Sequence, residues 1–153
     1  MNLIHFAAAP LGALYPKEQK PEAAMKPEGL WVSDEDAETS WTSWCNDESF
    51  ALDRLDRAHE ITLAADHNVL ILGDVAAIDG FTGSYGAQLF GRLGYIDWAA
   101  VASDYDGIII TPYQWSRRMT QHTFWYYGWD CASGCIWEPS AIGSIDAVAE
   151  VPS

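Results

Sequence analysis

The stretch between residues 25 and 45 combines the side chains of a ligand cleft, with aromatic rings on both sides of an acidic loop. Its expected elements are a strand, a turn and a helix, over 29–33, 34–38 and from Thr39 or Ser40 onward. Trp31 lies on the expected strand, and Trp41 and Trp44 fall on one face of the expected helix. The same residues could instead form a well-packed corner, and both interpretations stay open.

A second group of such residues lies between Pro112 and Gln121, where two of the five arginines stand among aromatic rings. Arg117 or Arg118 could hold a pyrophosphate, because a guanidinium group binds phosphate through two parallel hydrogen bonds. The alternative is a solvated loop whose charges meet only water.

Thiol and metal chemistry are not expected. Cys45, Cys131 and Cys135 make an odd number, and no targeting segment or membrane-length apolar run is recognised, so a reducing cytoplasm is the expected compartment. Cys131 and Cys135 lack the second pair of ligands that zinc needs, and no local motif makes Cys131 a nucleophile. Asp106 precedes Gly107 and is explained by turn chemistry.

The charge balance restricts the partners. Eight lysines and arginines stand against 22 acidic residues, a net charge of −14. Such a surface repels phosphate backbones and disfavours nucleic-acid binding. Solubility alone would explain the charge, whereas a sharper interpretation is a basic partner or a protein that imitates the charge of nucleic acid. Eight tryptophans indicate an aromatic core, an aromatic cleft or both.

The hydrophobic patterning predicts one α+β domain over residues 1–153, with a mainly antiparallel or mixed sheet. Strands are expected over 2–8, 29–33, 57–63, 69–72, 123–129, 134–137 and 144–151, and a turn feeding a strand over 104–111. Helices are expected over 11–15, 39–52 and 96–103, and a helical region is expected to begin at 73–74. Five glycines between 80 and 94 predict short helices joined by turns, and 17–27 is a surface loop.

Four segments, taken in chain order, resemble the motifs of the ADP-ribosyltransferase family, with some likeness to its phage and toxin branches. Residues 3–7, Leu-Ile-His-Phe-Ala, resemble the first-strand histidine motif. Residues 29–34, Gly-Leu-Trp-Val-Ser-Asp, followed by a Ser-led helix ending Trp-Cys at 44–45, resemble the second motif. Tyr-Asp-Gly at 105–107 and the strand ending Trp-Glu-Pro-Ser-Ala-Ile at 137–142 resemble the closing pattern.

The resemblance implies an ADP-ribosyltransferase-like fold of split mixed and antiparallel sheets with short helices, and NAD as the substrate. It places His5, followed in the motif by Phe6, on the adenosine-side ribose of NAD. Trp31 would stack on nicotinamide in place of the usual tyrosine, and Ser33 would lie within reach of the ribose or carboxamide. Trp44 would support the cleft.

Arg117 would contact the pyrophosphate, and the loop around Trp115 would meet the macromolecular target, which is expected to be a protein. The Arg117 assignment rests on guanidinium chemistry, whereas the target-facing loop is what the resemblance implies, together with transfer of ADP-ribose to that target.

The chain departs from the family at the catalytic acid. Counting back from Ile142 places Ser133 where the family has glutamate, and Asp130 is the nearest acid upstream. Glu138 matches the acidic residue of the terminal turn and is expected to be structural. Either Asp130 replaces the glutamate, or activity is altered or lost. The rivals are therefore an inactive, acidic inhibitor or decoy and a protein that only binds an ADP-ribose-like nucleotide.

Overall fold

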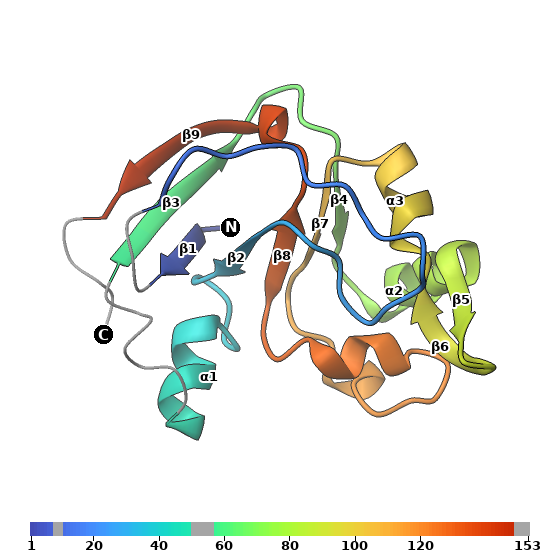
Figure 1. The fold of residues 1–153 in the computed structure, drawn as a ribbon. Coiled ribbons are helices and arrows are strands. Elements are labelled where there is room, and N and C mark those ends of the chain that lie inside the picture. Colours follow the sequence, from blue (N-terminus) through green and yellow to red (C-terminus); the bar gives the residue numbers. More distant parts are fainter. Residues whose placement is uncertain (8–10, 50–56, 149–153) are drawn as a thin grey trace.

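The computed structural model describes residues 1–7, 11–49 and 57–148, and in these it is a mixed α+β structure (Figure 1). The strands are β1 (Leu3–Ala7), β2 (Leu30–Asp34), β3 (Arg57–Leu63), β4 (Val69–Leu72), β5 (Gly86–Leu89), β6 (Arg92–Ile96), β7 (Gly107–Ile110), β8 (Ser133–Ile136) and β9 (Ile142–Ala147). The helices are α1 (Trp41–Glu48), α2 (Val75–Tyr85) and α3 (Trp98–Asp104). The 3-10 turns named among the described residues are η2 (Trp115–Arg117), η3 (Phe124–Gly128) and η4 (Pro139–Ala141).

Seven strands form one curled sheet in the order β4-β7-β8-β2-β1-β3-β9 (Figure 1). Strands β4 and β7 are parallel, and the other neighbours are antiparallel. The register sets Ser33 of β2 opposite Ile4 of β1 on one side and opposite Ser133 of β8 on the other. Three segments far apart in sequence thus become immediate neighbours.

Hydrophobic residues cover both faces of this sheet. On β7, Ile108 and Ile110 pack into one cluster and Ile109 into the other, and all three are fully buried. Because successive side chains of a strand point to opposite faces, this division explains why β7 is an unbroken β-branched run. The expected buried strand is confirmed.

Each of the three helices begins at a side-chain cap that the sequence supplies. Ser40 accepts a hydrogen bond from the Ser43 amide at 3.1 Å, Asp74 from Ala77 at 2.7 Å, and Asp97 from Ala100 at 3.1 Å. These side chains satisfy amide groups that a helix N-terminus leaves unpaired. The expected helix starts at Ser40 and Asp74 are confirmed, although residues 50–52 of the first lie outside the described part of the chain.

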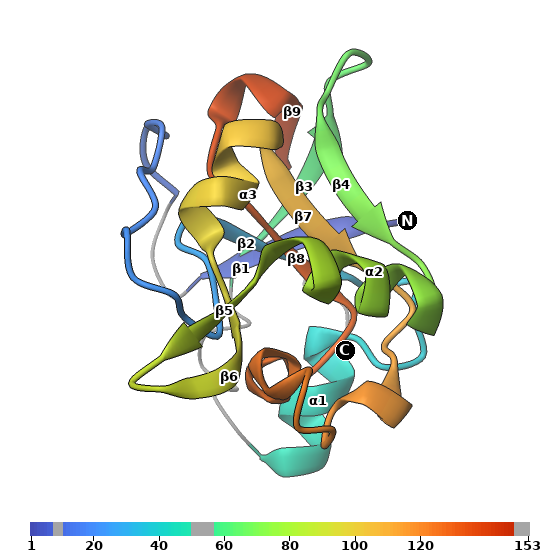
Figure 2. The same ribbon diagram turned by 90° about the vertical axis from the view of Figure 1, so that its right-hand side faces the viewer.

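The larger core cluster is aromatic and lies beneath α2, α3 and the β5–β6 hairpin, which face the viewer in Figure 2. Four of the eight tryptophans are at most 4% exposed: Trp98, Trp125, Trp129 and Trp137. The Trp98 ring lies 6.1 Å from that of Trp125 and 6.5 Å from that of Trp129. Tryptophan therefore supplies much of the core volume of this side of the sheet.

Two sequence expectations for the aromatic half are wrong. Residues 123–129, expected to be a strand, instead contain the 3-10 turn η3 over 124–128. Trp125 and Tyr126 are adjacent and both fully buried in the same cluster, and a strand would point one of them away. Of residues 80–94, expected to form short helices joined by turns, 80–85 are helical in α2, whereas 86–94 belong to the β5–β6 hairpin. The two-residue turn of this hairpin has positive φ at both Phe90 and Gly91.

Two smaller expectations also need correction. Residues 11–15 contain no helix, because the few hydrogen bonds of a single turn do not offset the cost of helix nucleation. Segment 17–27 has little regular structure, as expected, but it is anchored: the buried Gln19 side chain bonds both backbone groups of Glu28. The last strand ends at Ala147, and residues 149–151 lie outside the described part of the chain.

The carboxylate of Asp34, at the end of β2, joins three parts of the sheet. Its Oδ1 accepts hydrogen bonds from the amides of Asn2, before β1, at 3.0 Å and of Asp36 at 3.2 Å. Its Oδ2 accepts one from the hydroxyl of Thr111, after β7, at 2.7 Å. Asp34 is 5% exposed, so water does not replace these bonds.

We expect Asp34→Ala to lower the free energy of unfolding by about 3 kcal/mol, because it leaves buried donors without an acceptor. Asp36→Ala is the matched control on the same turn; its side chain is exposed, and the expected change is within about 0.5 kcal/mol. Guanidinium unfolding followed by tryptophan fluorescence measures both. Equal effects of the two substitutions would contradict this role of Asp34.

Candidate functional site

A cavity of about 270 Å³ opens at the centre of the sheet, where β1, β2 and β8 are adjacent. Its walls also include the start of α1 and the segment that leads into β8. The lining residues are Ile4, His5, Phe6, Lys26, Trp31, Val32, Ser33, Trp41, Trp129, Asp130, Cys131 and Ser133. Six of the eight residues expected at the site lie here: His5, Phe6, Trp31, Ser33, Asp130 and Ser133.

His5 is held in one tautomer by the neighbouring strand. Its Nδ1 lies 2.6 Å from the backbone carbonyl oxygen of Trp31, which can only accept, so Nδ1 carries the hydrogen. Burial lowers the pKa of His5, the bond to Trp31 opposes that shift, and His59 lowers the pKa further. A neutral His5 therefore retains Nε2 as a hydrogen-bond acceptor.

Ser33 connects β2 to the first turn of α1. Its hydroxyl donates to Oε2 of Glu35 at 2.5 Å and accepts a hydrogen bond from the amide of Trp41 at 2.8 Å. Both partners follow within eight residues, so the acidic loop folds back onto the strand that precedes it. This contact brings the Trp41 ring to the cavity wall.

Trp31 joins the cavity to the aromatic core. The Trp129 ring meets it edge to face, with 4.9 Å between the ring centres. The ammonium group of Lys26 lies 5.2 Å from the centre of the Trp31 ring, within the range of a cation–π contact. Trp129 of the aromatic core thus holds the Trp31 ring in place, and the Lys26 ammonium group already lies over that ring.

Ser133 and Cys131 form the β8 side of the cavity. The Ser133 hydroxyl donates to the backbone oxygen of Cys131 at 2.9 Å, and Ser133 lies opposite Ser33 in the register. Burial raises the pKa of the Cys131 thiol to about 12, so it is protonated at neutral pH. The thiol is therefore unsuited to act as a nucleophile.

Asp130 is the carboxylate of the cavity lining, and Arg118 binds it from outside. The Nη2 atom of Arg118 lies 3.4 Å from Oδ1 of Asp130. The Nη1 atom donates to the hydroxyl of Tyr113 at 2.7 Å and to the backbone oxygen of Trp129 at 3.3 Å. The acid is thus placed beside a guanidinium group that the protein itself anchors.

Aromatic rings surround the same guanidinium group. Its carbon lies 5.3 Å from the ring centre of Trp44, 6.0 Å from that of Trp115 and 5.1 Å from that of Tyr127. Trp44 therefore does not line the cavity and instead supports Arg118, one layer behind Asp130. Trp115, expected in target recognition, is 56% exposed.

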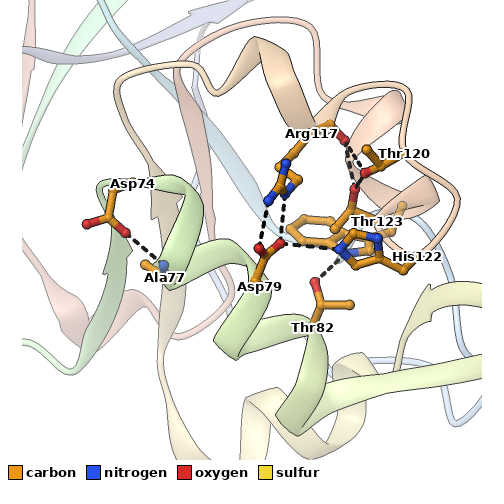
Figure 3. Close-up of polar contacts among 9 residues, drawn as sticks. Asp74, Ala77, Asp79, Thr82, Arg117, Thr120, His122 and Thr123 are labelled. Carbon is orange, nitrogen blue, oxygen red and sulfur yellow. Dashed lines mark hydrogen bonds and ion pairs between the residues drawn. The ribbon is translucent and has the colours of Figure 1, made fainter.

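Arg117 is directed away from the cavity, toward α2. Its Nε and Nη2 atoms each lie 2.8 Å from a carboxylate oxygen of Asp79, and Nε2 of His122 lies 3.3 Å from the same group (Figure 3). The hydrogen bonds from Arg117 hold the pKa of Asp79 at about 2. Arg117 therefore fastens η2 to α2, and the structure does not place it as a phosphate-binding group of this cavity.

Sequence reasoning missed four lining residues of chemical interest: Lys26, Trp41, Trp129 and Cys131. No local signal marks Lys26, because it stands in a Pro-bounded loop. The sequence marks Trp41 only as part of a helix face and Trp129 only as part of an aromatic run, so neither pattern points to a cavity. Glu138 accepts a hydrogen bond from the amide of Ser140 at 3.4 Å, a structural role in the terminal turn.

The cavity lining offers a ligand an aromatic face, a hydrogen-bond acceptor and a carboxylate. The Trp31 ring can stack, Nε2 of His5 can accept from a hydroxyl, and Asp130 can stabilise positive charge. In the described ranges no group of three or more His, Cys, Asp or Glu could hold a metal ion, and no helix is long and apolar enough to cross a membrane.

Comparison with known proteins yields no relative: no family model, no curated protein and no solved structure matches this chain.

The titration of His5 makes a prediction about stability. A histidine whose pKa is lower in the folded than in the unfolded protein, where it is about 6.5, binds its proton preferentially when unfolded. Its stabilising contribution is therefore complete above about pH 6.5 and is lost as the pH falls through the folded pKa. We expect His5→Asn, whose amide can still donate to Trp31, to lose less unfolding free energy than wild type between pH 7.5 and 5.5.

Chemical unfolding at both pH values tests this. His5→Gln is the matched variant, because its longer amide cannot reproduce the Nδ1 donor; at pH 7.5 it should be about 1 kcal/mol less stable than His5→Asn. An unchanged pH dependence in His5→Asn would show that His5 does not titrate as inferred.

Proposed function

We propose that this chain is an ADP-ribosyltransferase-like protein that binds NAD in the cavity and transfers ADP-ribose to a macromolecular target. One observation carries the proposal. Residues selected by resemblance from three distant segments, around positions 5, 31 and 133, line the same cavity, together with Asp130. Unrelated chance similarities would have no reason to converge on one place.

The charges and hydrogen bonds of the lining support NAD as the ligand. Nicotinamide in NAD is flat and cationic, which suits stacking on Trp31, and the Nε2 acceptor of His5 suits a ribose hydroxyl. A cavity of about 270 Å³ accommodates the nicotinamide and its ribose, and the adenosine end would extend toward His5 and Phe6 at the β1 wall.

The proposed reaction breaks the glycosidic C–N bond, whose electron pair leaves on the nicotinamide nitrogen. The ribose carbon acquires oxocarbenium character, and the carboxylate of Asp130 stabilises that charge. An acceptor atom of the target then bonds to this carbon and loses its proton. Ser133 stands where the family places its glutamate, and its hydroxyl is engaged with the Cys131 oxygen, so in this proposal the acid is Asp130.

A second candidate is a nucleotide-binding protein without turnover, serving as an acidic inhibitor or decoy. The contact between Asp130 and Arg118 favours it, because a carboxylate already paired with a guanidinium group has less charge to offer a cationic sugar. The net charge of −14 fits a basic protein partner.

Calorimetric titration with NAD, followed by a nicotinamide-release assay, separates the two candidates. We expect wild type to bind NAD and release nicotinamide, and Asp130→Asn to release it about 100-fold more slowly with NAD affinity within about threefold of wild type. Asp47→Asn, an exposed carboxylate on α1, is the control and should match wild type.

NAD binding without nicotinamide release, alone or with candidate targets, would establish the second candidate. Absence of binding at millimolar NAD would overturn both candidates as nucleotide binders. An Asp130→Asn protein that turns over as fast as wild type would remove Asp130 from the mechanism while leaving NAD binding in place.

A further inference from the structure

Arg117 and Arg118, the arginines considered for phosphate binding, each already pair with an acidic residue of this protein. Arg117 forms two 2.8 Å hydrogen bonds with Asp79, and Arg118 contacts Asp130 within its aromatic surround. An anionic ligand in the cavity would have to break one of these pairs to use either arginine. A cation of the cavity lining without a carboxylate partner could bind an anion without breaking such a pair.

Lys26 is the only lysine or arginine among the described residues that line the cavity. It pairs with no carboxylate in the described part of the chain, whereas Lys20, six residues earlier, pairs with Glu28 at 3.6 Å. Because its pKa is lowered, His5 adds no full positive charge near neutral pH. The ammonium group of Lys26 is therefore the available cation of this wall.

The aliphatic stem of Lys26 lies against Gly128 of η3. A Cβ atom at Gly128 would lie 3.4 Å from Cε of Lys26 and 3.4 Å from Cε of Met25, so the lysine stem crosses η3 where a side chain is absent. Its ammonium group then lies 5.2 Å from the Trp31 ring centre. Lys26 is exposed, so its stem contacts η3 on one side while its charged end is open to solvent and can turn.

A ligand stacked on Trp31 would change the interactions of the Lys26 ammonium group. A cationic ring on Trp31 would compete with the ammonium group for the same aromatic surface and would repel it. A phosphate attached to the ligand would offer the displaced ammonium a charge-assisted hydrogen bond. The contact with Trp31 is thus a resting position from which Lys26 can reach an anion.

We propose that Lys26 forms an anion-binding subsite of the cavity, which selects phosphorylated over unphosphorylated forms of the same aromatic nucleoside. The inference deepens the proposed function, since it assigns to Lys26 the phosphate contact that the sequence assigned to Arg117. It rests on the proposed function only for the identity of the aromatic ring.

Two matched ligand pairs test the subsite by calorimetry: nicotinamide riboside against nicotinamide mononucleotide, and adenosine against AMP. Wild type should bind the phosphorylated member of a pair about tenfold more tightly. Lys26→Met keeps the stem and removes the charge, and should reduce the ratio to below about twofold, because the phosphate then has no ammonium group to bind. Lys26→Arg should retain most of the preference.

Lys20→Met is the control, because Lys20 lies in the same loop and is engaged with Glu28. It should leave the ratio at the wild-type value. Raising the salt concentration should weaken the binding of the phosphorylated ligands more than that of the nucleosides. Near-ultraviolet circular dichroism of each variant reports whether the aromatic cluster is intact.

The outcomes separate this inference from the NAD proposal. If the nicotinamide pair binds with equal affinities, or if Lys26→Met leaves the ratio unchanged, the subsite is overturned and the NAD proposal stands. If only the adenosine pair binds, with a preference that Lys26→Met removes, the subsite stands and the nicotinamide assignment falls. Absence of binding by all four ligands at millimolar concentration overturns both.

Discussion

The backbone pairing of β2 with β1 on one edge and with β8 on the other is the constraint on which the cavity depends. It sets residues near positions 5, 31 and 133 next to one another, although more than 100 residues separate the first from the last. The Asp34 carboxylate reinforces this arrangement at the end of β2, where it joins the segments beside β1 and β7. A shift of one residue in either pairing would turn the cavity side chains to the opposite face of the sheet.

The aromatic core gives this site its rigidity. Trp129 belongs to the buried cluster and to the cavity wall, and it meets Trp31 edge to face. On the other side, Arg118 lies among three aromatic rings and reaches Asp130. A ligand would therefore meet side chains whose positions are already fixed, which lowers the entropy lost on binding.

The few positive charges of this acidic protein have separate structural roles. Arg117 fastens η2 to α2 through Asp79, and Arg118 orients Asp130. Lys20 pairs within its own loop, and Lys26 lies on the Trp31 ring. The chain carries eight lysines and arginines, so each engaged cation leaves fewer for a ligand. This scarcity gives Lys26 its importance in the cavity.

The sequence by itself determined those features that depend on neighbouring residues. The buried run of β7, the strands β3 and β4, and the caps at Ser40 and Asp74 follow from local patterning and hydrogen-bonding chemistry. Six residues of the cavity lining were also selected from the sequence, five by the order of the motifs and Asp130 as the nearest acid upstream of Ser133. The family assignment built on those motifs stays a prediction.

Only the tertiary structure decided the remainder. Adjacent arginines at the end of a 3-10 turn cannot be told apart by pattern, yet Arg117 pairs with Asp79 of α2 and Arg118 with Asp130. Burial of both Trp125 and Tyr126 in one cluster overrode the strand expected there, and the β5–β6 turn used Phe90 at positive φ, where sequence statistics favour Asn or Gly. Lys26 reached the cavity through packing across Gly128, a contact between segments about 100 residues apart. Such contacts depend on the whole chain, so local sequence carries no signal for them.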